Sequence, residues 1–237
     1  MKIEPAILIK DKQICNQNGE LINIRGFTLD NSLPEDTSRP LYYCSLDEAD
    51  PESTFEDIKK RGCSLIRWII YWNVVEPEEG KFNEAYLAKL RDFIKLAEKI
   101  GLLVYLVPMI SVEDKPFWGS NTYPADKMID GEFAGFYYAQ LFSEAMNHTA
   151  RRIKDCENVI GFSLPLCYDK LMNTQVSSNQ LSELTSRFMH LLHKKHLQYY
   201  FIAETAELYD AAKKNDEKKA AVLASIFLEN NQVMLTY

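Results

Sequence analysis

Short apolar runs alternate along this chain with longer stretches whose apolar residues recur at every third or fourth position. Each run is short enough to be a buried strand, and the longer stretches have the spacing of amphipathic helices, most clearly over residues 83–100. The apolar runs begin near Leu21, Leu65, Leu102, Val159, Tyr199 and Val233. This order predicts βαβ units, in which successive strands are parallel and helices cover them.

The remaining elements follow from the same pattern and from residues that favour turns and helix ends. Residues 6–9 and 12–15 predict a β-hairpin, and Gly19 predicts a turn with positive φ after it. Asn83 is suited to cap the start of a helix. We expect strands over residues 21–29, 64–72, 102–108, 159–165, 199–203 and 232–237, and helices over residues 53–61, 83–100, 132–153, 178–196 and 206–229.

The predicted strands by themselves leave the type of α/β architecture open. An open, doubly wound sheet accommodates the six runs, whereas a (β/α)8 barrel requires eight strands. No glycine-rich turn follows the strand predicted over residues 21–29, so a nucleotide-binding Rossmann fold has no support.

Composition and charge exclude several classes of protein. The chain has 237 residues, of which 46% are apolar, and 34 Asp and Glu against 27 Lys and Arg give a formal net charge of -7. An acidic chain lacks the basic surface of sequence-independent nucleic-acid binding, so we expect no nucleic-acid partner. No apolar run reaches the roughly 20 residues of a membrane span. Lys10 and Asp11 interrupt the first short apolar run, so no secretory signal is predicted and we expect a cytoplasmic protein.

The cysteines and histidines give little support for a metal or disulfide site. The five cysteines, Cys15, Cys44, Cys63, Cys156 and Cys167, are widely spaced and form no CxxC pair. We therefore expect reduced thiols rather than a zinc knuckle or a disulfide scaffold. His193 and His196 are spaced for a metal on a helix, but Lys194 and Lys195 lie between them and no third ligand is evident. A solvated helix end is the favoured interpretation.

Several blocks of sequence resemble the family 5 glycoside hydrolases, especially the endoglycoceramidase and cellulase type. The blocks are Asn23-Ile24-Arg25-Gly26-Phe27-Thr28-Leu29, Gly62-Cys63-Ser64-Leu65-Ile66-Arg67-Trp68, Trp72-Asn73-Val74-Val75-Glu76-Pro77-Glu78-Glu79-Gly80-Lys81-Phe82-Asn83 and Asn158-Val159-Ile160-Gly161-Phe162. The resemblance covers about residues 10–170 and implies a TIM-barrel-like (β/α)8 fold, here incomplete, with about six βα units after an N-terminal β-hairpin. We therefore expect one glycosidase-like barrel domain over residues 1–237, with the C-terminal units missing.

The resemblance implies a retaining hydrolysis of O-glycosyl bonds by two glutamates about 5–5.5 Å apart. One protonates the leaving oxygen and the other attacks the anomeric carbon. Cys167 stands at the acid/base position and Leu166 at its asparagine neighbour, while Met109 ends the run that replaces an Asp-x-His pattern. The nucleophile belongs to a seventh strand, which is not predicted here. We therefore expect a catalytically impaired protein, a pseudoenzyme, that retains carbohydrate or glycolipid binding.

Arg67 is the family's polar position that carries over, and it needs an anionic partner when buried. Glu204, at the end of the fifth predicted strand, is the nearest candidate partner and also the one weak candidate for a catalytic acid. Glu76 could pair with it, but Glu76 lies in an acidic turn, where a surface role is favoured. The predicted substrate contacts are Arg67, as the family's polar position, and Trp72, Trp118 and Tyr123, because aromatic faces stack on sugar rings. Anchoring of a loop is the alternative role of these aromatic residues.

Three further points accompany this prediction. The resemblance implies no cofactor. Cys167 could be a nucleophile, but no histidine lies at a motif distance, so a buried thiol is favoured.

Two alternatives remain open: an active glycoside hydrolase within a longer or assembled protein, and a non-catalytic assembly component. In the second, unpaired sheet edges near Leu21 and Val233 would pair with another copy or with a partner chain.

Overall fold

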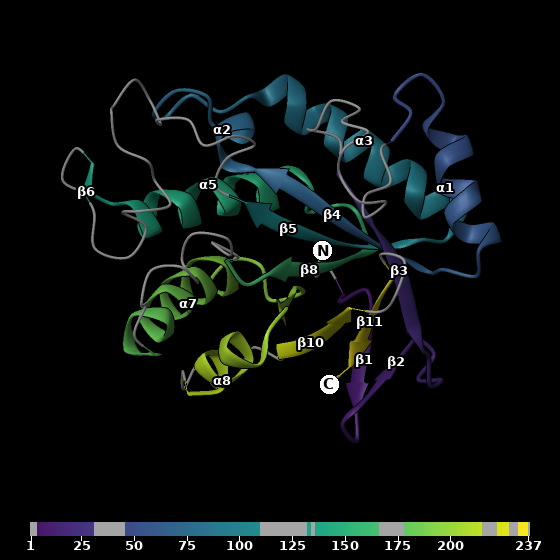
Figure 1. Cartoon of the computed structure of the whole chain (residues 1–237). Helices are drawn as coiled ribbons and strands as arrows, with labels where there is room; N and C mark the ends of the chain where they lie inside the picture. Colours follow the sequence, from purple (N-terminus) through teal and green to yellow (C-terminus); the bar gives the residue numbers. More distant parts are fainter. Residues whose placement is uncertain are drawn as a thin grey trace, which may run out of the picture.

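Strands and helices alternate through the chain, and the strands wrap into a closed barrel (Figure 1). The computed structural model describes residues 4–30, 46–109, 132–133, 136–165, 178–214, 222–227 and 232–236. Around the barrel the strands are β3 (Ile24–Leu29), β4 (Leu65–Tyr71), β5 (Leu103–Met109), β8 (Val159–Ser163), β9 (Tyr200–Ala203), β10 (Val222–Phe227) and β11 (Gln232–Thr236). Neighbouring strands from β3 to β9 are parallel, as the sequence predicts, and β10 is parallel to β9.

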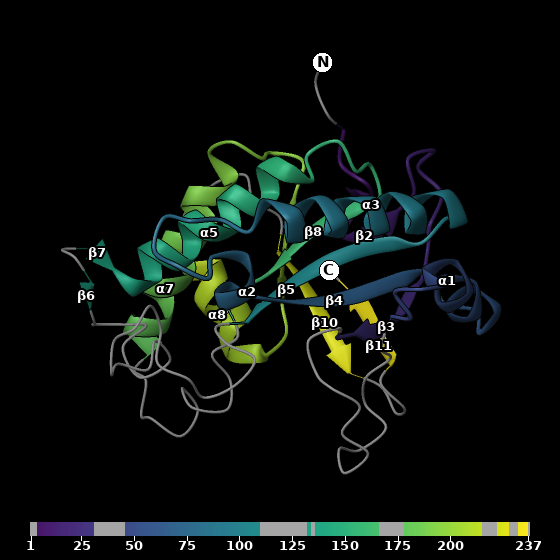
Figure 2. The same ribbon diagram turned by 90° about the horizontal axis from the view of Figure 1, so that it is seen from above.

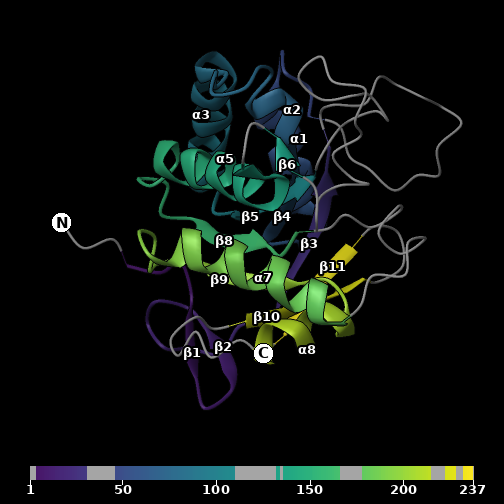
Figure 3. The same cartoon turned by 90° about the vertical axis from the view of Figure 1, so that its left-hand side faces the viewer.

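Helices cover the outside of much of this barrel, so β4, β5, β8 and β9 are largely buried on both faces. The helices are α1 (Pro51–Lys60), α2 (Trp72–Val75), α3 (Glu84–Ile100), α5 (Tyr138–Arg152), α7 (Ser178–His193) and α8 (Ala206–Lys214). Figure 3 shows α3, α5 and α7 lying one after another outside the strands. Every residue of β4 is buried, which explains its near-continuous apolar run. The α/β barrel architecture, incomplete relative to a (β/α)8 barrel, is therefore confirmed.

The clearest predicted helix has the ends that its sequence favours. The side chain of Asn83 accepts a hydrogen bond from the backbone N–H of Tyr86 at 3.1 Å and so caps the start of α3. Gly101 ends the helix with a φ of 80°, a left-handed conformation that glycine adopts without strain. The inward face of α3 carries Leu87, Leu90, Ile94 and Ala97, all buried.

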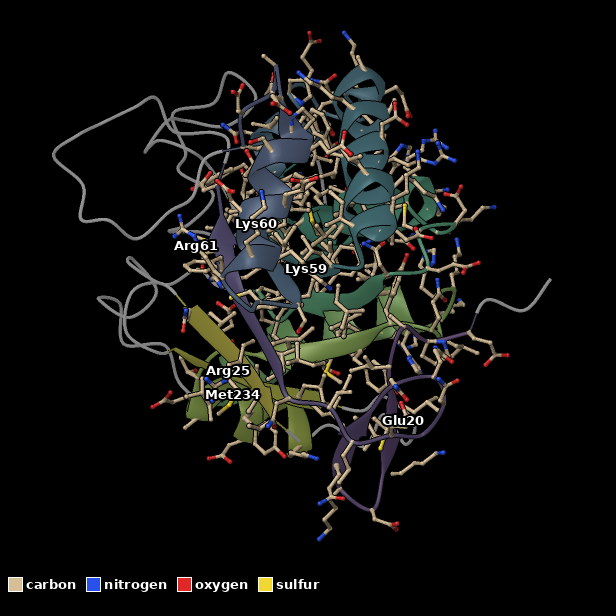
Figure 4. The ribbon with its side chains drawn as sticks, turned by 90° about the vertical axis from the view of Figure 1, so that its right-hand side faces the viewer. Glu20, Arg25, Lys59, Lys60, Arg61 and Met234 are labelled. Atoms are coloured by element: carbon tan, nitrogen blue, oxygen red, sulfur yellow. The ribbon has the colours of Figure 1, made fainter. Side chains whose placement is uncertain are left out.

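The barrel closes through a strand that runs in the opposite direction to the others. β11 pairs antiparallel with both β10 and β3. Its residue Met234 is the register partner of Arg25 on β3, and Figure 4 shows the two side by side. The expectation of unpaired edges near Leu21 and Val233 is therefore wrong, because the C-terminal strand pairs with β3 and completes the ring.

Two other predictions of secondary structure are also corrected. Residues 206–229 are not wholly helical, because β10 pairs in parallel with β9 over Val222–Ala224 and its alanine-containing sequence is drawn into the barrel. The predicted helix over residues 132–153 begins only at Tyr138. Before it, β6 (Glu132–Phe133) and β7 (Phe136–Tyr137) form an antiparallel pair, visible beside α5 in Figure 2.

The N-terminal hairpin is present, with its turn placed between the two predicted strands. β1 (Leu8–Lys10) pairs antiparallel with β2 (Gln13–Cys15). The two turn residues, Asp11 and Lys12, have φ values of 49° and 62°, the positive values that a tight two-residue hairpin requires. Gly19 also has a positive φ, as predicted, in the turn that leads from the hairpin toward β3.

Close approach between neighbouring strands generates a first testable prediction, at Gly161 on β8. A Cβ atom at this position would overlap the backbone carbonyl oxygen of Tyr200 on β9. We expect Gly161→Ala to lower the free energy of unfolding by about 2–3 kcal/mol or more, because the backbone of a barrel strand cannot move away freely. Urea unfolding followed by circular dichroism measures this loss.

Gly62→Ala is the matched control. No atom lies within 4 Å of a Cβ at Gly62, and the cost there is the positive φ of 79° alone. That cost is about 1 kcal/mol. Equal losses for the two variants would contradict the close approach of β8 to β9.

Candidate active site in the barrel interior

A buried ion pair crosses the interior of the barrel. Arg67, in the middle of β4, donates from Nε to Oε1 of Glu204 at 2.6 Å and from Nη2 to Oε2 at 2.5 Å. Glu204 directly follows β9, which is not a neighbour of β4 around the ring. The two residues are only 7% and 6% exposed. The prediction that Glu204 is the anionic partner of Arg67 is therefore confirmed, with bidentate geometry.

A tyrosine extends this pair to a further strand. The hydroxyl of Tyr105, on β5, donates to Oε1 of Glu204 at 2.9 Å and lies 3.2 Å from Oγ of Ser225 on β10. Burial, reinforced by the negative charge of Glu204, raises the pKa of Tyr105 well above its usual value. Tyr105 therefore remains a neutral donor. Four strands or strand ends, β4, β5, β9 and β10, are joined in this way across the centre of the barrel.

The surroundings of Glu204 determine what chemistry it can perform. Each of its carboxylate oxygens accepts a hydrogen bond from Arg67, and Oε1 also accepts one from Tyr105. Its side chain is 1% exposed. A glycosidase nucleophile needs an oxygen lone pair directed at the anomeric carbon, and an acid/base residue needs a proton to exchange. In this structure the carboxylate links the end of β9 to β4 and β5 across the barrel.

A second buried carboxylate, which the sequence did not single out, follows the first barrel strand. Asp30 comes directly after β3, is 3% exposed and accepts a hydrogen bond from the hydroxyl of Tyr71 at 2.9 Å. The signal that could have found it is its position, since polar residues at the carboxyl ends of barrel strands form the active sites of such folds. Asp30 and Glu204 therefore both lie at this end of the barrel, after β3 and β9.

Trp72 and Glu76 differ from their predicted roles. Trp72 is fully buried, packs edge-on against Phe142 and donates from Nε1 to Oε2 of Glu76 at 2.8 Å. A fully enclosed indole offers no face to a sugar ring, so its prediction as a substrate contact is corrected. Glu76 is also buried, not a surface residue, and Oε1 accepts a hydrogen bond from the backbone N–H of Gly80 at 2.7 Å. It holds the turn after α2 in place.

Burial also affects the protonation of Glu76. It raises the pKa of this carboxyl group, and the hydrogen bonds from Trp72 and Gly80 oppose that rise. No described contact joins Glu76 to Glu204, so the structure does not support the relocated acid pair. Three predicted site residues, Cys167, Trp118 and Tyr123, lie outside the described residues.

Among the described residues, neither the histidine pair nor the cysteines form a metal site or a disulfide. α7 ends at His193, so His196 lies beyond the helix, and because it is only 4% exposed the interpretation as a solvated helix end is wrong for this residue. Across the described ranges, no group of three His, Cys, Asp or Glu residues could hold a metal ion. Cys15, Cys63 and Cys156 are buried free thiols, as predicted. Burial raises the pKa of Cys156 to about 12, which keeps this thiol protonated.

Comparison with known proteins identifies the kind of barrel. The profile of Glycosyl hydrolases family 35 matches residues 27–114, the stretch from β3 to just beyond β5. Beta-galactosidase 13 of Arabidopsis thaliana is 46% identical over 66 residues, which are 25% of this chain and 8% of that relative. The chain thus matches a small part of a much longer protein.

Solved structures extend the likeness to most of the chain. An exo-beta-1,4-mannosidase from Opitutaceae bacterium strain TAV5 has a TM-score of 0.61 at 12% identity, over 86% of this chain and 34% of that one. The catalytic domain of Thermobifida fusca endoglucanase Cel5A, in complex with cellotetraose, has a TM-score of 0.53 at 13% identity, over 92% of this chain and 63% of that one. The chain therefore has the barrel fold of glycoside hydrolases and spans less than two thirds of these structures.

Among the described residues, none of the helices combines the length and the apolar character needed to cross a bilayer.

The buried pair generates a second prediction. We expect Glu204→Gln or Arg67→Met alone to lower the free energy of unfolding by about 3–5 kcal/mol, because each leaves its partner buried without compensation. The double variant Arg67→Met/Glu204→Gln should lose markedly less than the sum of the single losses. Denaturant unfolding of all four proteins gives the coupling energy of the pair.

Arg91→Gln provides the control, since it breaks a surface pair with Asp155. Such a pair is worth about 1 kcal/mol or less. The interpretation of Arg67 and Glu204 as a structural link would be wrong if their single variants lost no more than this control.

A third prediction concerns His196, which is 4% exposed and stacks on Tyr199. Burial lowers the pKa of His196 from 6.5 to about 4. Between these two values the unfolded chain binds up to about one more proton than the folded chain, so stability falls as the pH drops from 6.5 toward 4. We expect His196→Phe to flatten the pH dependence of unfolding in this range. An unchanged slope would show that His196 is already protonated, or accessible, in the folded protein.

Proposed function

We propose that this chain is a glycoside hydrolase-like domain of the family 5 type that binds a carbohydrate or glycolipid head group and is impaired in hydrolysis. The observation that carries the proposal is the bidentate ion pair between Arg67 and Glu204. Retaining hydrolysis needs two carboxyl groups about 5–5.5 Å apart that face the substrate from either side. In the described part of the barrel, the carboxylate nearest to the family's arginine has both oxygens engaged within the protein.

The topology of the barrel supports the same proposal. In an eight-stranded barrel, two more parallel strands would follow the sixth, and the family's nucleophile would stand at the end of the seventh. Here β11 alone occupies the arc between β10 and β3, and it runs antiparallel to both. Its carboxyl end therefore faces away from the edge where the other strands end. No strand end of the described ring occupies the position from which a nucleophile would act.

Cys167 enters the proposal as the residue at the acid/base position. A thiol is a poor proton donor to a glycosidic oxygen compared with a carboxylic acid whose pKa is tuned near the working pH. The loss of an acid/base group costs roughly 10²–10⁴-fold in rate. This substitution and the engaged Glu204 would each reduce turnover independently.

The proposed ligand follows from the relatives. The matching curated protein is named a beta-galactosidase, and the similar endoglucanase was crystallised with cellotetraose. We propose Trp118 and Tyr123 as aromatic contacts to the sugar, because they fall in the stretch after β5, on the active-site side of such a barrel. Arg67 is proposed as a positioning residue, since its donors Nε and Nη2 are used by Glu204.

The test combines a rate assay with a binding assay. Purified chain should show no release of nitrophenol from aryl β-galactoside, β-glucoside or β-mannoside above that of heat-denatured protein. Calorimetry with cello- and galacto-oligosaccharides should detect binding, and Trp118→Ala or Tyr123→Ala should weaken it about tenfold or more without lowering the melting temperature.

Other outcomes have definite meanings. Turnover that falls in Glu204→Gln but persists in the exposed neighbour variant Glu207→Gln would establish an active hydrolase and overturn the proposed impairment. Absence of both turnover and sugar binding would overturn the carbohydrate role and leave the assembly alternative. The Glu207 control changes the same charge at a position in the first turn of α8.

A further inference from the structure

A hollow of about 440 Å³ lies between α3 and the C-terminal part of α5, on the outside of the barrel. These helices lie beside each other in Figures 2 and 3. The charged residues that line the hollow are Glu84, Arg91, Arg151, Arg152, Lys154 and Asp155. Four cations thus face two carboxylates, although the whole chain has a formal net charge of -7. The hollow is a local region of positive charge on an acidic protein.

Both carboxylates are already paired. Glu84 accepts two hydrogen bonds of 2.7 Å from Arg152, and Asp155 accepts bonds of 3.0 and 2.5 Å from Arg91. These bidentate contacts fix the planes of two guanidinium groups in the wall of the hollow. The Arg152 contact also lowers the pKa of Glu84 to about 2, so this carboxylate stays charged and paired above that pH.

Arg151 is held in a different way, by a neutral acceptor. Its Nη2 donates to Nδ1 of His148 at 2.9 Å, while Nε2 of the same ring lies 2.9 Å from Oε1 of Glu84. The ring is 7% exposed and stacks on Phe82 with centroids 3.8 Å apart. Because Nδ1 accepts, the ring proton is on Nε2 and the imidazole is uncharged. Burial lowers the pKa of His148, which favours this form.

The consequence is a fixed positive charge without a counter-charge. Arg151 is positioned by a buried, neutral ring, and it makes no ion pair with any described residue. Lys154, close by and exposed, also has no carboxylate partner among the described residues. After the two bidentate pairs are accounted for, the lining retains two positive charges, on Arg151 and Lys154.

We propose that this hollow binds a phosphate group, as a phosphate monoester, with Arg151 and Lys154 as its main contacts. A phosphate monoester is close to a dianion at neutral pH and so balances the two uncompensated charges. Guanidinium groups match the geometry of phosphate oxygens, and a lysine adds a mobile point charge. The volume of about 440 Å³ exceeds that of a phosphate alone and accommodates an attached group of sugar size. The site is separate from the barrel interior and does not depend on the proposed function.

The experiment is calorimetry at low ionic strength with inorganic phosphate, glucose 6-phosphate and glucose. We expect both phosphates to bind, with affinity that falls as salt is added, and glucose alone not to bind at this site. Arg151→Gln/Lys154→Gln should weaken phosphate binding about tenfold or more, because two charge-assisted contacts are lost. Both substituted residues are exposed, so the variant should fold, and its melting temperature confirms this.

Lys60→Gln/Lys99→Gln is the matched control, because it removes the same charge from exposed positions outside the hollow. It should leave phosphate affinity within about twofold of the wild-type value. Tighter binding of the ester than of inorganic phosphate would support a hollow that holds the attached group, and equal binding would support a phosphate site alone. No binding of either phosphate, or equal weakening in both double variants, would overturn the proposal. Sugar binding that depends on Trp118 is a separate result, because it tests the proposed carbohydrate site of the barrel and not the phosphate site in the hollow.

Discussion

The bidentate pair between Arg67 and Glu204 is the interaction on which the interior of this barrel depends. An arginine in the middle of a fully buried strand is tolerated only if an anion meets it with good geometry. The partner comes from 137 residues further along the chain, so the pair joins strands that are not neighbours. Tyr105 and Ser225 complete the network, and the centre of the barrel is polar but satisfied.

The hydrogen bonds of Glu204 also bear on the function that we propose for the chain. In an active retaining glycosidase, a carboxylate must keep free lone pairs beside an open cleft. Glu204 accepts three hydrogen bonds from Arg67 and Tyr105, and its side chain is almost completely enclosed. The same contacts that stabilise the barrel are therefore the ground on which we propose that this carboxylate takes no part in hydrolysis. The fold of a glycoside hydrolase is present, while the group nearest its centre acts as a structural cross-link.

Much of the fold could be predicted from sequence, because buried parallel strands and amphipathic helices leave strong periodic patterns. The pairing of Arg67 with Glu204 could be predicted as well, since a buried cation must find an anion. β10 was not predicted, because the helix-favouring alanines and lysines of residues 211–221 lead directly into it and a short apolar run does not distinguish a strand from a buried helix. The burial of Trp72 and Glu76 could not be predicted from the sequence either. An acidic turn next to a tryptophan does not reveal which helix packs over these two side chains.

The antiparallel β11 has a consequence for how the chain reaches its folded state. β3 pairs with β4 soon after both are made, but its other edge is satisfied only by residues some 200 positions later. During synthesis that edge, with its unpaired amides and carbonyls, would remain available to other chains until β11 has been made. The ring thus closes in one late, long-range step, and the hazard of misassembly is concentrated in the interval before that step.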